Sequence, residues 1–438
     1  MKKIRWSYII FSLVVLPIII FSNNFILSCT NNNVAINNFV CSINLEETAT
    51  EDDDKETIDE ETEENEDKTT TEEDNNDDNL DSFVQTSLTK IDFTSLENLV
   101  SLVQNDYQYS FIQSFFTLIQ QVMSGEKVYN FNDFVGIFNE CFIDGIKSIL
   151  PIFISMIIIA ILYGLLKNMS DRLNNGSVKK IIFIAIWGVM IIMIVYLVSK
   201  SIIETKKTID YFGNFINIVF PILITIITAL GGSYTVSIYQ PLVLVFSQFI
   251  FKIIELVIFP LFYASFVFTI ISGFSEESLL KKLSSTTKSA ANWILGIVFS
   301  IFITVTTAQG ITGASFDSLA IRGAKYALSS YVPVLGNYLS QGFDLVMASF
   351  VVVKNAVGLS AVLLIIYMAI FPIIKLLVII FGFKFVGAII EPIAGKKLAD
   401  LFTNTASCLM LLVVILIALA FTIFIFLMLI IYSCNWGL

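Results

Sequence analysis

The sequence predicts an all-α fold: a polytopic α-helical membrane protein with about eight transmembrane helices. They follow an N-terminal signal sequence and a small helical extracytoplasmic region. Hydrophobic residues make up 56% of the 438-residue chain and charged residues only 14%, with a mean hydropathy of +0.80. From residue 146 onward, apolar runs recur, and most are long enough to cross a bilayer as helices. A helix satisfies its own backbone groups in lipid, which an open sheet cannot do.

Residues 1–28 have the pattern of a signal peptide, because a basic start precedes the apolar run Tyr8–Phe21. The segment is either cleaved or kept as an uncleaved anchor, and both fates export the residues that follow. Cys29 follows Ile26-Leu27-Ser28, which loosely resembles a lipoprotein cleavage box. Lipidation of Cys29 is therefore an alternative fate for this segment.

Residues 29–82 are predicted to form a disordered, acidic extracytoplasmic linker. Between residues 46 and 78 there are 19 Asp or Glu against two Lys, a balance of −17 within a total of −11, so the rest of the chain carries +6. Such a tract buries too little apolar surface to offset the entropy of ordering. Its carboxylates lack the spacing of a calcium loop, which favours a solvated charge run.

Residues 83–145 are amphipathic, because apolar residues recur there at intervals of three and four. Two or three helices are expected, forming a small cap on the membrane body. The residues that carry this periodicity are Leu96, Leu99, Val100, Val103, Phe111, Phe115, Phe116 and Ile119.

Residues 146–438 are interpreted as the multi-span transmembrane domain. Basic residues cluster in three of its loops, and the positive-inside rule assigns those loops to the cytoplasm, with the C-terminus outside. The run 345–381 could hold a re-entrant half-helix as well as a span, and Lys375 within it is expected to snorkel to the inner interface. The remaining expected spans are 146–166, 181–199, 213–231, 237–254, 256–273, 291–309 and 405–432.

The composition argues against catalysis and against nucleic-acid binding. The chain has no histidine, which removes the usual general base and a preferred metal ligand. Its five cysteines are scattered and form no CxxC pair. No basic stripe with interleaved aromatic residues appears. We therefore expect that the protein is not an enzyme and that it has no catalytic residue, no cofactor and no metal site.

Polar residues inside the apolar runs are the candidate pore or partner-contact positions, because an ionisable group at membrane depth usually faces protein or water. Lys354 and Asn355 are the better site candidates. Lys252 and Glu255 are expected to flank a tight extracytoplasmic turn, with a buried charge pair as the alternative. The remaining candidates mark helix breaks or span ends, or an amphipathic outer helix: Pro221, Gly231, Gly232, Gln309, Gly310, Arg322, Lys325, Glu391 and Pro392.

Two of these features have alternative interpretations. Pro221 and the Gly231-Gly232 pair favour either broken helices that line a polar site or simple kinks with a short glycine turn. Glu391 precedes Pro392, and the restriction on a residue before proline predicts a helix break there.

The order of several short motifs between residues 140 and 405 resembles the stage III sporulation protein AE family. They are Phe220-Pro221 with Gly231-Gly232, Trp293-Ile294-Leu295-Gly296, Ala308-Gln309-Gly310, Arg322-Gly323-Ala324-Lys325-Tyr326, Val332-Pro333-Val334-Leu335-Gly336, Lys354-Asn355-Ala356-Val357-Gly358 and Ile389-Ile390-Glu391-Pro392-Ile393. The acidic tract at 46–78 matches no motif of that family.

The resemblance implies a non-enzymatic subunit of a channel or secretion-like complex that links the mother cell with the engulfed forespore. Implied partners are the other stage III sporulation proteins, AA to AH, and indirectly the forespore stage II protein Q, besides the lipid bilayer. The implied location is the mother-cell membrane around the forespore, with the N-terminal region extracytoplasmic. The alternative is an autonomous secondary transporter or permease with a midplane site near Lys354.

Overall fold

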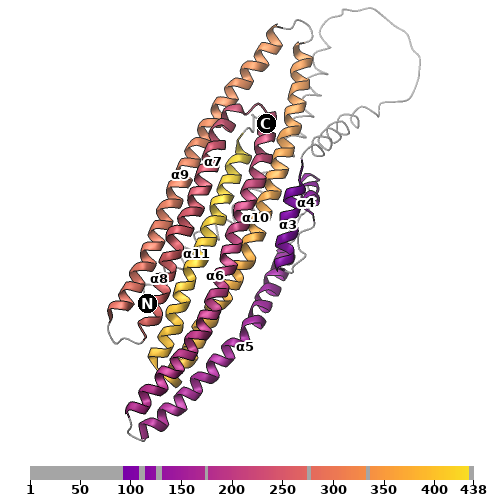
Figure 1. Cartoon of the computed structure of the whole chain (residues 1–438). Coiled ribbons are helices and arrows are strands. Elements are labelled where there is room, and N and C mark those ends of the chain that lie inside the picture. The colour runs from indigo at the N-terminus through magenta and orange to yellow at the C-terminus, as the bar shows by residue number, and fades with distance from the viewer. Residues whose placement is uncertain are drawn as a thin grey trace, which may run out of the picture. The chain divides into compact units, whose positions relative to one another are not determined.

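The computed structural model describes residues 92–107, 114–124, 131–172, 176–273, 278–331 and 336–433. The predicted signal peptide, the acidic linker and Cys29 lie outside these residues. The described part is helical and contains no strand (Figure 1). Its elements are α3 (Thr94–Tyr107), α4 (Phe115–Met123), α5 (Phe131–Arg172), α6 (Gly176–Ala229), α7 (Ser233–Ile253), the π-helix η1 (Ile254–Ile258), α8 (Phe259–Ile271), α9 (Ser278–Tyr331), α10 (Gly336–Ala394) and α11 (Lys396–Tyr432).

The chain divides into two compact units. The larger comprises Ile91–Gly323 and Lys354–Ser433, and it holds most of the described helices. The described part of the smaller unit is Ala324–Val353, where an ion pair between Lys325 and Asp344 joins the end of α9 to the start of α10.

Six described helical stretches are long and apolar enough to cross a membrane, which agrees with the polytopic α-helical fold class. They are Phe138–Met169, Lys180–Ala229, Gln248–Ile271, Leu280–Ala308, Gly342–Ala394 and Lys396–Tyr432. The separate spans expected at 181–199 and 213–231 are one continuous helix, α6. The spans expected at 237–254 and 256–273 are likewise joined through η1.

Helix α6 continues through its charged middle because that segment contains no helix breaker. Residues 200–212 lack both proline and glycine. Two hydroxyls there bond to carbonyls one turn back: Ser201 to Leu197 at 2.9 Å and Thr205 to Ser201 at 2.7 Å. These polar side chains are thus satisfied within the helix, and the loop implied between the expected spans 181–199 and 213–231 does not form.

The tight turn expected at Lys252 and Glu255 is also absent, because both residues lie within the continuous helical path of α7, η1 and α8. Pro260 lies in the first turn of α8. Proline lacks an N–H and crowds the carbonyl four residues back, and the wider turn of a π-helix relieves that conflict. The local sequence therefore widens the helix where we expected it to reverse.

Two glycines with positive φ make the described helix reversals that do occur. Gly231 (φ 74°) follows α6 and Gly395 (φ 93°) follows α10, and L residues with side chains rarely adopt this conformation. The short glycine turn at Gly231-Gly232 is therefore the correct alternative. The helix break predicted at Glu391 is wrong, since α10 runs through Pro392 and ends at Ala394.

The core of the larger unit forms where long helices run alongside one another (Figure 1). Helix α11 packs against α6 and α8, and α6 also contacts α3, α5 and α7. Phe383 of α10 meets the ring of Phe153 in α5 edge-on at 5.3 Å, beside Gly382, where a Cβ would lie 2.1 Å from that ring. Helix α3 is in contact with both α4 and α6, so α3 connects the short helix α4 with the long helix α6.

Candidate functional site at a polar belt on helix α6

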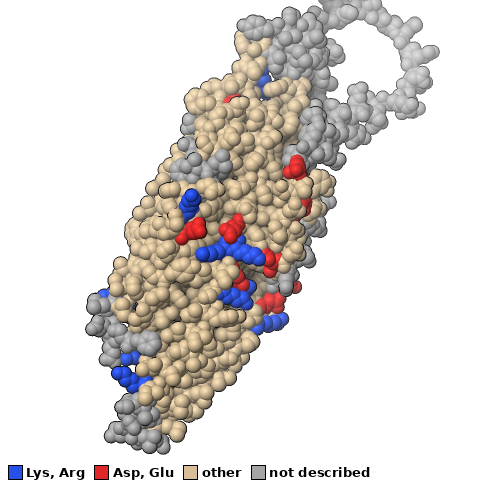
Figure 2. Space-filling view, in the orientation of Figure 1, with Lys and Arg blue, Asp and Glu red and all other residues tan. Residues whose placement is uncertain are grey.

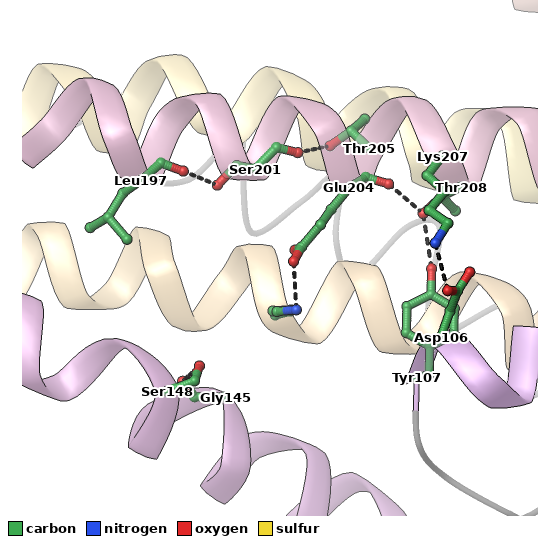
Figure 3. Close-up of polar contacts among 11 residues, drawn as sticks. Asp106, Tyr107, Gly145, Ser148, Leu197, Ser201, Glu204, Thr205, Lys207 and Thr208 are labelled. Atoms are coloured by element: carbon green, nitrogen blue, oxygen red, sulfur yellow. Dashed lines mark hydrogen bonds and ion pairs between the residues drawn. The ribbon is translucent and has the colours of Figure 1, made fainter.

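Six polar side chains from three helices meet halfway along α6, and we call this cluster the polar belt (Figure 3). Helix α6 supplies its residues at helical spacing, so that they share one face of an otherwise apolar helix. The members are Asp106 and Tyr107 of α3, Glu204, Lys207 and Thr208 of α6, and Lys375 of α10.

The inner part of the polar belt is an ion pair between α10 and α6. Lys375 Nζ lies 2.6 Å from Glu204 Oε1, and the two side chains are 35% and 25% exposed. A half-buried charge without a counter-charge is costly, so the pair fixes which faces of α6 and α10 meet. Lys375, which we expected to snorkel to the inner interface, thus has a carboxylate partner on α6.

The outer part of the polar belt attaches α3 to α6. Asp106 Oδ1 lies 2.6 Å from Lys207 Nζ, and the hydroxyls of Tyr107 and Thr208 lie 3.1 Å apart. Burial raises the pKa of Tyr107 to about 12, assisted by the nearby carboxylates and opposed by the Thr208 hydrogen bond. The Tyr107 phenol therefore stays neutral, and its O–H can donate a hydrogen bond to the Thr208 hydroxyl, which itself donates to the carbonyl of Glu204 at 2.9 Å.

Two aromatic contacts lie at or beside the polar belt. The Tyr107 ring stacks on Phe371 of α10, with centroids 5.6 Å apart. Lys206 Nζ lies 5.0 Å from the ring centre of Phe259, a cation–π contact between α6 and α8. Figure 2 shows acidic and basic side chains gathered partway along the visible face, with largely uncharged surface on both sides.

The polar belt is suited to holding helices in register. Its carboxylates each face a lysine, and hydroxyls complete its network. The described residues contain no group of three or more His, Cys, Asp and Glu side chains placed to hold a metal ion. Sequence reasoning missed this cluster, although Glu204, Lys207 and Thr208 stand at intervals of three and four in the charged segment between two apolar runs.

Lys354 is completely buried, with 0% exposure, and its ammonium donates to the main-chain carbonyl of Ser433. Ser433 is the C-cap residue of α11. A cation at a helix C-terminus meets the negative end of the helix dipole. The geometry therefore gives Lys354 a structural partner at the end of α11. Its neighbour Asn355 is half-buried in α10.

A buried carboxylate that the sequence did not single out as a site caps α7. Asp317 is 2% exposed and accepts hydrogen bonds from the main-chain N–H groups of Tyr234 at 3.0 Å and Thr235 at 2.9 Å. Gly232 supplies no side chain to cap this helix, so α9 provides the capping carboxylate instead. This contact ties the Gly231-Gly232 turn to α9.

The other sequence candidates are distributed over several helices and are not gathered into one site in the described part. Pro221 is exposed on α6, Lys252 and Glu255 are exposed on the α7 and η1 segment, and Glu391 and Pro392 are exposed near the end of α10. The expected amphipathic outer helix is part of α9, where Arg322 is exposed and Lys325 pairs with Asp344. The backbone of Gln309 and Gly310 continues α9, but their side chains lie outside the described set.

Comparison with known proteins agrees with the resemblance noted in the sequence. The family model of stage III sporulation protein AE matches residues 113–434. The curated stage III sporulation protein AE of Bacillus subtilis (strain 168) is 26% identical over 241 residues, which cover 55% of this chain and 60% of that relative. This alignment thus spans less than two thirds of the relative. No solved structure matches the chain. Because the family model covers well over half of its length, the chain belongs to the stage III sporulation protein AE family.

Proposed function

We propose that this protein is a non-enzymatic, integral membrane subunit of a channel or secretion-like complex that links the mother cell with the forespore. It would be needed for forespore development after engulfment, in the mother-cell membrane with its N-terminal region outside the cytoplasm. The family match over residues 113–434 carries the proposal. Its partners would be other stage III sporulation proteins, AA to AH, and indirectly the forespore stage II protein Q.

The contacts made by the buried and half-buried charged residues support a structural role more than a catalytic one. Lys354 bonds to the end of α11, Asp317 caps α7, and Lys375 pairs with Glu204. Each of these groups holds one helix against another. A subunit of a larger assembly needs helices that are held firmly against one another, but it does not need a catalytic group of its own.

The outer face of α6 supports assembly with other subunits. Beyond the polar belt this helix exposes uncharged polar side chains, among them Asn214, Asn217, Thr225 and Thr228. The Thr225 and Thr228 hydroxyls bond to carbonyls one turn back, at 2.9 and 2.8 Å, whereas an Asn amide is unfavourable against lipid tails and forms hydrogen bonds between helices or with water. Such a face is suited to contact with protein or with an aqueous passage.

A clean deletion in an endospore-forming bacterium that carries this gene tests the proposal. We expect development to stop after engulfment, with heat-resistant spores restored by the wild-type gene. Photo-crosslinking side chains at Asn214 and Asn217 should then capture other stage III proteins, while one at Ile192 on the same helix should not. Normal spore counts in the deletion strain would refute the proposed function.

An autonomous transporter with a site at Lys354 is the competing hypothesis, because a completely buried lysine lies beside the half-buried Asn355. Purified protein in liposomes distinguishes the two. Substrate flux without partners that Lys354→Ala abolishes would favour the transporter.

A further inference from the structure

A small polar cavity opens where four helices of the larger unit converge, far along α6 from the polar belt. Its volume is about 70 Å³. A water molecule needs roughly 10–15 Å³ of such space, so the cavity admits a group the size of a small oxyanion. The lining residues are Trp187 of α6, Thr269, Ser272 and Gly273 at the end of α8, Lys281 of α9, and Lys397, Asp400, Leu401 and Asn404 of α11.

The inner wall of this cavity is fixed by close packing. Trp187 is fully buried, and a Cβ built on Gly273 would lie 1.8 Å from its indole ring. Only glycine allows α8 to approach the indole so closely. The Thr269 hydroxyl donates to the carbonyl of Ser265 at 2.9 Å and lies 2.8 Å from the hydroxyl of Ser284. The side chains of this wall are therefore held in place by their own packing and hydrogen-bond partners.

The mouth of the cavity is basic. Lys281 Nζ lies 3.0 Å from Asp400 Oδ2, and these side chains are 59% and 41% exposed, so the pair is accessible. Lys397 lies in the first turn of α11, directly after the Gly395 reversal. Two lysines and a single aspartate thus line the cavity, and Asn404 adds a neutral amide.

Exposed apolar side chains occur on two of the helices that line this cavity. Ile271 precedes Ser272 on α8 and is 44% exposed, while Leu283 follows Lys281 by two residues on α9 and is 47% exposed. Both helices include stretches apolar enough to cross a membrane. A ligand with a phosphate at the mouth could therefore lay hydrocarbon along these neighbours.

We propose that this cavity binds a phosphoryl group, and that its source is the headgroup of an anionic phospholipid. Lys281 and Lys397 bind the phosphate oxygens through charge-assisted hydrogen bonds, and Asn404 donates a third. Asp400 holds Lys281 when the site is empty and competes with the anion for it. Basic pockets between helices at a membrane surface recognise lipid headgroups in this way. The inference is independent of the sporulation complex proposed above.

The test uses the full-length chain purified in an uncharged detergent and titrated with phosphatidylglycerol, with phosphatidylcholine or with inorganic phosphate, binding being measured by native mass spectrometry. We expect phosphatidylglycerol to bind and phosphatidylcholine to bind far more weakly. Lys397→Gln should weaken binding about tenfold, the effect of losing one charge-assisted hydrogen bond. Competition by inorganic phosphate at low concentration would identify free phosphate as the source.

Matched controls separate a built site from diffuse surface charge. Lys396→Gln and Lys282→Gln each remove a neighbouring lysine that does not line the cavity and should change affinity less than twofold. Asp400→Asn should strengthen binding, whereas a purely structural ion pair predicts only a lower unfolding temperature. Equal losses from Lys396→Gln and Lys397→Gln would overturn the proposal. If Asp400→Asn fails to fold, that pair of lysine variants decides the question alone.

Discussion

The two halves of α6 differ in what they expose, although both bury apolar side chains. Before the polar belt the exposed large hydrophobic residues are Ile181, Ile184, Val189, Ile192, Val195, Tyr196 and Ile203. After it, the exposed residues up to Ala229 are Asp210, Asn214, Asn217, Pro221, Thr225, Thr228 and Ala229 itself. A hydropathy average counts buried and exposed faces together, so it describes both halves as membrane spans. Only the outer face distinguishes a surface suited to lipid from one suited to water or protein.

The polar belt lies where this outer face changes character. There α6 is joined to α10 through Lys375 and to α3 through Asp106 and Tyr107. If the two halves of α6 meet different surroundings, contacts that fix the axial position of the helix are stabilising, because sliding along its axis would move polar groups into lipid. The contacts of the belt provide that fixed position.

The largest effect should come from a charge placed on the first half of α6. Ile192 is 71% exposed. Ile192→Asp should cost about 2.5–3.5 kcal/mol of insertion free energy if this face contacts lipid tails, and the amount of protein in the membrane fraction should fall sharply.

The matched control for this experiment is Asn217→Asp, which adds the same charge to the second half of α6. Because that face already carries polar groups, the membrane yield of the variant should stay near wild type. Quantitative blotting of membrane fractions measures both variants. Similar losses in the two would show that the halves do not differ in their surroundings.

Loss of the inner ion pair should have the next largest effect. Lys375→Ala leaves Glu204 half-buried without its cation. A fully buried unpaired charge costs 3–5 kcal/mol, and partial exposure reduces this to about 1–3 kcal/mol. The unfolding temperature of the detergent-purified protein should fall. The double variant Lys375→Met with Glu204→Gln should recover most of the loss, and the interpretation fails if it is worse than the single change.

These contacts also mark the limit of what could be predicted from the sequence. The apolar runs and their lengths predicted the membrane fold class, because backbone satisfaction in lipid leaves helices as the available structure. The two helix reversals with positive φ lie at Gly231 and Gly395, and both glycines can be seen in the sequence. Glu204 and Lys375, by contrast, lie on different helices, and only packing brings them together. The bond from Lys354 to Ser433 depends on the position of a helix end, which local propensity does not determine.

Tyr107→Phe should have a smaller effect, because it removes one hydroxyl and leaves the ring on Phe371. The lost hydrogen bond to Thr208 is worth about 1 kcal/mol. Hydrogen exchange of the amides of α3 measures how firmly this helix lies on α6, and exchange should become faster in the variant. Thr208→Val should produce a similar change if the two hydroxyls form the bond.

The same hydroxyl gives α3 a defined response to alkaline pH. The pKa of Tyr107 is raised from 10.0 to about 12, so its contribution is fully present below pH 10 and is lost as the pH rises toward 12. Exchange of α3 should therefore differ between wild type and Tyr107→Phe by a constant amount from about pH 6 to about pH 9. Above about pH 10 the difference should shrink. A change near neutral pH would contradict the assignment of a neutral phenol.

The smallest effect should come from Asp106→Asn. Its lysine partner is 52% exposed and the aspartate itself 31%, so water screens the ion pair despite its 2.6 Å separation. Exposed pairs of this kind contribute about 0.2–1 kcal/mol, and salt weakens them further. Exchange of α3 in the wild type should thus become slightly faster in high salt, while the variant should hardly respond. A strong salt response that persists in Asp106→Asn would assign it to other charges, and α3 would then be held mainly by Tyr107 and its ring contacts.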